Sequence, residues 1–165
     1  MGVGFRRFLM PSTSCTAPKW IAGILRTQNI SSIRNEFTWE DSILPAIEAG
    51  QAVAVDDGYT LDDMLMVQPA PGHTLSHCAT HLHSHHSHAI FSGDVMHVPL
   101  QVYYPHWGTS LDDDPQLGVR SRLHLLESCA ESRTLLLPTH FVPNHGCFIA
   151  RRGDGFAVKW NDTSS

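Results

Sequence analysis

Three side chains that suit metal chemistry lie at the ends of apolar stretches of this sequence. His73 lies on a Pro-Gly turn, Asp94 directly follows Gly93, and His140 comes just after the apolar run that begins at Leu135. Imidazole and carboxylate groups both bind zinc, and functional residues on sheet scaffolds commonly lie in loops at strand ends. We therefore expect His73, Asp94 and His140 to form part of a metal site.

Histidine is concentrated in the middle of the chain. All 12 histidines fall between His73 and His145, and seven of them lie between His73 and His88. The densest stretch, His81 to His88, is interpreted as an exposed turn, and adventitious binding of Zn²⁺, Ni²⁺ or Cu²⁺ is the alternative. His97 is interpreted either as a support for a metal ligand or as a loop residue near a substrate.

The composition limits the class of protein. With 165 residues, 42% of them apolar, the chain has the size of one folded domain. A net charge of −5 argues against nucleic acid as a partner, and no apolar run approaches the roughly 20 residues that cross a membrane. The four cysteines form no C-x-x-C pair, so we expect reduced thiols and a cytoplasmic location. Residues 1–35 contain arginine but no acidic residue, which makes mitochondrial targeting the alternative.

Short helices and strands must position the candidate residues. A helix is expected after Asp41 or Ser42, ending before Gly50, and strands are expected over 52–55 and 65–68. Alternation over 77–83 and the apolar run 89–91 predict a hairpin around a polar turn at 84–87. The outer ends of that hairpin are His73 and Asp94, so it would bring these two residues together.

The second half of the chain adds a helix and further strands. Residues 95–107 are expected to form a loop with some strand. Pro115 is expected to begin a long helix, with Asp112 to Asp114 as N-terminal charge and not as metal ligands. The run 135–137 predicts a strand buried on both faces, and a hairpin is expected around 153–155.

Three motifs, PAPGHTLSH, FSGDVMH and LLLPTHF, occur in this order, and together they resemble the C-terminal half of a metallo-β-lactamase-fold hydrolase. The resemblance covers most of 37–160 and is to the branch with lactonase-like and organophosphate-hydrolase-like members. It implies an α/β fold, namely an incomplete αββα sandwich over 37–165, with 1–36 as an unassigned extension. It also implies a dinuclear zinc site in which His73 completes the first metal's ligands, Asp94 bridges both metals and His140 binds the second. The zinc ions would activate water and polarise the carbonyl of an ester or lactone.

One family feature is absent from this sequence. The hydrolases carry an H-x-H-x-D-H signature upstream of the PGH turn, whereas no histidine precedes His73 here. The HLHSHH stretch lies after that turn and lacks the aspartate. The chain is thus interpreted as a truncated zinc hydrolase, weak or inactive alone, or else as a non-catalytic half-domain that binds a partner or metal. A half sandwich leaves one sheet face uncovered, which predicts exposed apolar surface and self-association.

Overall fold

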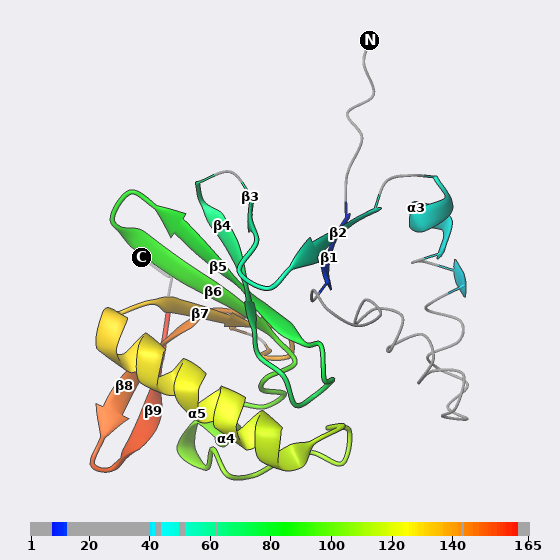
Figure 1. Cartoon of the computed structure of the whole chain (residues 1–165). Coiled ribbons are helices and arrows are strands. Elements are labelled where there is room, and N and C mark those ends of the chain that lie inside the picture. Colours follow the sequence, from blue (N-terminus) through cyan, green and yellow to red (C-terminus); the bar gives the residue numbers. More distant parts are fainter. Residues whose placement is uncertain are drawn as a thin grey trace. The chain divides into compact units, whose positions relative to one another are not determined.

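The computed structural model describes residues 8–12, 40–41, 44–49, 52–61, 63–142 and 144–161 (Figure 1). The chain divides into two compact units, 1–59 and 60–165, while the domain limits expected from the sequence stay a prediction. In the first unit, β1 (Phe8–Ser12) pairs in parallel with β2 (Ala52–Asp56), and α3 (Leu44–Glu48) precedes β2 in sequence.

Two elements of the first unit agree with the sequence and one was not expected. The helix and the strand were predicted at the positions of α3 and β2, whereas β1 lies in the segment left without an assignment. The sequence proposed Asp41 or Ser42 as the first cap of this helix and Gly50 as the last. Ser42 and Gly50 lie outside the described residues, whereas Asp41 is described.

The second unit is a seven-stranded mixed sheet with helices, which confirms the α/β class. Its strands lie side by side in chain order: β3 (Thr60–Leu61), β4 (Leu65–Pro69), β5 (Cys78–Ser84), β6 (Ser87–Gly93), β7 (Leu135–Pro138), β8 (Cys147–Arg152) and β9 (Gly155–Trp160). Neighbours are antiparallel except β6 and β7, which are parallel. The helices α4 (Leu100–Tyr103) and α5 (Pro115–Ser132) form the crossover that a parallel pair requires.

Helix α5 forms as the sequence predicts, and it runs across one face of the sheet (Figure 1). Asp114 is its N-cap and accepts a hydrogen bond from the Leu117 amide at 2.9 Å, and Pro115 occupies the first helical position. On its apolar side Leu126 and Cys129 are fully buried in the core, and Leu123 and Ala130 pack against that core partly buried. No described helix is long and apolar enough to span a membrane.

The two faces of the sheet differ in burial. The face that carries Ala79, Ile90 and Leu136 belongs to the same core as α5. On the opposite face Leu135 and Leu137 are partly exposed, and Phe91 is 45% exposed. The prediction that 135–137 is buried on both faces is therefore wrong, because only the Leu136 side faces that core.

The segment 95–107 contains the short helix α4 and no strand, so the expected partial strand is wrong. The Gln101 side chain accepts hydrogen bonds from the His97 amide at 2.7 Å and the Val98 amide at 3.3 Å, and it donates to the Trp107 carbonyl at 2.9 Å. The buried Arg122 guanidinium donates to that carbonyl at 2.9 Å as well. These bonds satisfy the backbone locally, which removes the need for a strand partner.

Candidate metal centre

The turn that carries His73 is fastened to the start of α5. Gly72 has φ +141°, and a Cβ there would lie 2.2 Å from the Cα of Gly118 in the helix. The Asp114 amide donates to the Gly72 carbonyl at 3.0 Å, and the Asp113 amide donates to the His73 carbonyl at 3.1 Å. Only a glycine-to-glycine contact lets the two backbones approach this closely. These backbone contacts with the start of α5 therefore fix the position of His73.

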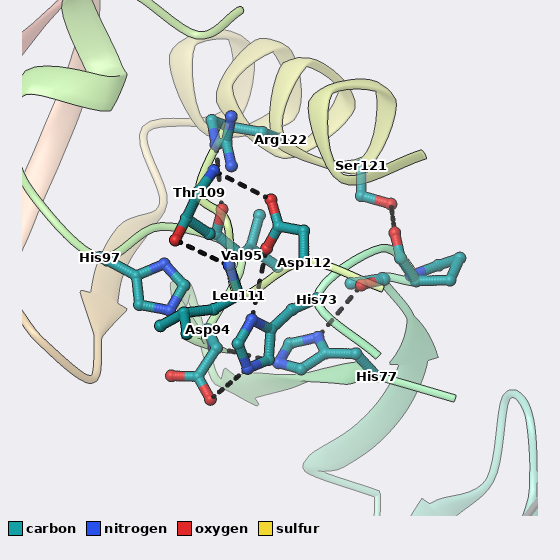
Figure 2. Close-up of polar contacts among 12 residues, drawn as sticks. His73, His77, Asp94, Val95, His97, Thr109, Leu111, Asp112, Ser121 and Arg122 are labelled. Atoms are coloured by element: carbon teal, nitrogen blue, oxygen red, sulfur yellow. Dashed lines mark hydrogen bonds and ion pairs between the residues drawn. The ribbon is translucent and has the colours of Figure 1, made fainter. Parts of the chain in front are cut away.

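The ring of His73 is oriented by a buried carboxylate. Its Nδ1 lies 3.3 Å from Asp112 Oδ1, and its Nε2 lies 3.6 Å from Asp94 Oδ2 (Figure 2). The Asp112 side chain is 1% exposed, so this partner is shielded from water. A carboxylate on one ring nitrogen fixes the tautomer and raises the basicity of the other nitrogen. Asp112 was expected only as helix charge. The sequence signal for its role at the site is that Asp112 lies two residues before the helix cap, outside the first helical turn.

His77 joins the two ends of the β5–β6 hairpin. Its Nδ1 donates to the Ala70 carbonyl at 3.1 Å, and its Nε2 accepts from the Asp94 amide at 3.0 Å. Both bonds require the neutral ring, and burial lowers the pKa of His77, which favours that form. Gly93 has φ +55°, and a Cβ there would lie 2.7 Å from His77 Nε2. The glycine before Asp94 thus makes room for the histidine that holds Asp94.

Asp94 lies between two histidines. Its Oδ1 is 2.7 Å from His140 Nε2, and its Oδ2 is the atom that faces His73. The side chain of Asp94 is 34% exposed and that of His140 is 48% exposed, so solvent reaches this side of the centre. The structure brings together all three residues selected from the sequence, while their roles as ligands stay a prediction.

His97 is more central than the sequence indicated. Its ring stacks on His140 at 5.2 Å between centroids and lies 5.1 Å from the His73 ring. Asp94, His97 and His140 each place one ligand-type atom within 4.8 Å of the others. Burial lowers the pKa of His97, and its Nδ1 is buried without a hydrogen-bond partner among the described residues. A buried imidazole nitrogen without a hydrogen-bond partner is uncommon, which marks His97 as a candidate functional residue.

The residues present suit a zinc ion. Three imidazoles and one carboxylate are nitrogen and oxygen donors of the kind that zinc prefers. The Nδ1 atom of His73 is already paired with the Asp112 carboxylate, which leaves its Nε2 for a metal. The histidine-rich stretch does not join this centre: His85 and His86 form the exposed turn between β5 and β6, at the end of the hairpin away from Asp94.

Comparison with known proteins finds similarity in structure but not in sequence profile. No protein-family profile and no curated protein sequence matches the chain. Among solved structures, it is similar to AidC, a dizinc quorum-quenching lactonase in complex with a product, with a TM-score of 0.68 and 25% identity over 74% of this chain and 42% of that one.

Two further solved structures have the same fold. The hydrolase AbOPH of the β-lactamase superfamily matches with a TM-score of 0.66 and 22% identity over 72% of this chain and 40% of that one. A probable metal-dependent hydrolase from Staphylococcus aureus matches with a TM-score of 0.60 and 17% identity over 71% and 42%. This chain spans about two-fifths of the length of these structures. The chain therefore has part of the metallo-β-lactamase fold of lactonases and related hydrolases, as its ordered motifs predicted.

Proposed function

We propose that this chain is part of a metallo-β-lactamase-superfamily hydrolase that uses zinc to cleave ester or lactone bonds. The observation that carries the proposal is the placement of Asp94. Its two carboxylate oxygens face different histidines, Oδ2 toward His73 at 3.6 Å and Oδ1 toward His140 at 2.7 Å. A carboxylate in that position is suited to bridge two cations, each bound by one of the imidazoles.

Each side chain of the centre has a task in this proposal. His73 would bind through Nε2, since Asp112 holds its Nδ1, and His140 would bind through the nitrogen that now faces Asp94. His77 would keep the Asp94 backbone in place, and His97, which has a ligand-type nitrogen within 4.8 Å of those of Asp94 and His140, would lie beside the metal. Zinc, when bound, would polarise the scissile carbonyl and lower the pKa of a bound water.

The substrate class is carried over from a structural neighbour. AidC is described as a dizinc lactonase, and a small ester or lactone is the corresponding substrate proposed for this chain. The described residues provide about half of a dinuclear ligand set, and His140 is nearly half exposed. We therefore expect weak activity from this chain alone.

A non-catalytic half-domain is the second candidate. The observation that favours it is the sheet face opposite α5, where Phe91 is 45% exposed and its neighbours Leu135 and Leu137 are partly exposed. An apolar surface of this kind is suited to a second copy of the chain or to another polypeptide. In this second candidate, the centre around Asp94 would bind metal without catalysis, and the sheet face that carries Phe91 would bind the partner.

Turnover assays with zinc-supplied protein separate the two candidates. We expect slow hydrolysis within a panel of small lactones and esters, which stops on addition of a chelator and in the variant Asp94→Ala. Asp154→Ala, in the exposed turn between β8 and β9, is the matched control and should retain the rate. Zinc binding without any turnover would favour the half-domain, and turnover that survives Asp94→Ala would contradict the proposed centre.

A further inference from the structure

We propose a second metal site at the tip of the β5–β6 hairpin, where His83 and His88 would bind one Cu²⁺, Ni²⁺ or Zn²⁺ ion. The two residues are direct cross-strand partners in the register of the hairpin. Their Nδ1 atoms are 2.6 Å apart and their ring centroids are 4.6 Å apart. Imidazole is the ligand that these three cations share, and His88 is exposed to solvent, which gives an ion access.

The spacing of the two nitrogen atoms is close to what chelation needs. Zinc–nitrogen bonds of about 2.0–2.1 Å in a tetrahedral site separate two ligand nitrogens by about 3.3 Å. The Nδ1 atoms would therefore have to move apart by less than about 1 Å from the observed 2.6 Å. Without metal, one Nδ1–H donates to the other Nδ1. With metal, that proton would move to Nε2 of the same ring by exchange with water, so both Nδ1 lone pairs become ligands.

The backbone holds the pair in place before any ion binds. The His83 amide donates to the Met64 carbonyl at 2.8 Å, which ties the end of β5 to the β3–β4 connection, directly before β4. The two-residue turn closes with His85 at φ +52°, and Ser84 pairs with Ser87 directly before it. Two ligands fixed on adjacent strands lose little conformational freedom on binding, which favours chelation.

The surroundings of the pair also suit a cation. Residues 77–93 contain no lysine or arginine, so no permanently positive side chain from either strand repels a divalent ion. His81 lies on the same sheet face as His83, two residues earlier, and provides a further imidazole about 7 Å along the strand.

This site is independent of the proposed hydrolase function. Asp94 follows the other end of β6, six residues from His88, which corresponds to about 20 Å of extended strand. An ion at the tip would nevertheless act on the same hairpin, because it would link β5 and β6 through side chains as well as through the backbone. The expected consequence is a more stable hairpin.

Nickel titration of the full chain tests the site. We expect a Ni²⁺-binding component in calorimetry that weakens at least tenfold in His83→Asn/His88→Asn and persists in Asp94→Ala. The control is His86→Asn, which removes an exposed imidazole from the same turn and should leave this component unchanged. Ni²⁺ should also raise the unfolding temperature of the parent and of the control, and it should raise that of the double variant less.

Two results would overturn the proposal. One is an identical Ni²⁺ isotherm for the parent and the double variant. The other is an equal loss of affinity in His86→Asn, which would assign binding to the histidine-rich turn in general. The single variant His88→Asn, whose side chain is exposed, provides the same comparison if the double variant changes the circular dichroism spectrum.

Discussion

Replacement of Gly93 by alanine tests how the candidate centre is held together. Gly93 has φ +55°, a conformation that costs an alanine about 1–2 kcal/mol. The new Cβ would also lie 2.7 Å from His77 Nε2, so the ring would have to leave its position. His77 would then lose its bonds to the Ala70 carbonyl and the Asp94 amide, worth about 1–3 kcal/mol together. The sum predicts a loss of about 2–5 kcal/mol in the free energy of unfolding.

Gly153→Ala is the matched control. Gly153 has nearly the same conformation, φ +57°, but nothing lies within 4 Å of a Cβ at that position. The control variant should lose only the backbone cost of about 1–2 kcal/mol. Urea unfolding followed by tryptophan fluorescence measures both losses, and zinc titration measures the effect on the centre. Equal destabilisation of the two variants, or unchanged zinc affinity in Gly93→Ala, would refute the role assigned to His77.

Three further predictions concern the rest of the second unit. Asp112→Asn should weaken zinc binding by about 10–100-fold, because His73 loses its charged partner. Zinc titration checks this against Asp154→Asn, and equal affinity in both variants would contradict it. Burial raises the pKa of the Cys129 thiol to about 12 and that of Cys147 to about 11. In native protein at pH 8, mass spectrometry after maleimide treatment should find both unmodified, whereas unfolding in urea should expose them; native labelling at the rate of an unfolded thiol would be the opposite result. Phe91→Glu should reduce self-association in sedimentation velocity more than Met64→Glu, which changes a residue of similar exposure in the β3–β4 connection. An equal effect of the two would argue against the sheet face as the contact.

The sequence was sufficient for the elements with strong local signals. Helix α5 has an aspartate cap, a proline at its first position and apolar residues at helical spacing, and these signals are local. The β5–β6 hairpin has alternating residues and a polar turn, and its register brings the residues next to its outer ends, His77 and Asp94, together. His73 also lies near Asp94, but it reaches that residue from the turn before β5 and not as an end of the hairpin.

The sequence was insufficient where side chains act over long separations. Asp112 contacts His73 from 39 residues away, and its place before the helix cap does not reveal that partner. His77 resembles a strand-face histidine until the Ala70 carbonyl and the Asp94 amide are placed on either side of its ring. In the segment 95–107 the Gln101 side chain bonds to the His97 amide and the Trp107 carbonyl, and the aromatic, proline-broken sequence from which a partial strand was expected does not reveal these bonds.

Zinc binding to the variant His83→Asn/His88→Asn tests most directly the central claim, which is that Asp94 and its neighbouring histidines form a metal centre. In the His83→Asn/His88→Asn background, the Asp94 centre is the proposed site that remains. Competition with a chromophoric chelator should then detect zinc bound by this chain, and the additional change Asp94→Ala should abolish that binding while circular dichroism stays the same. Zinc affinity that is unchanged by Asp94→Ala would contradict the account.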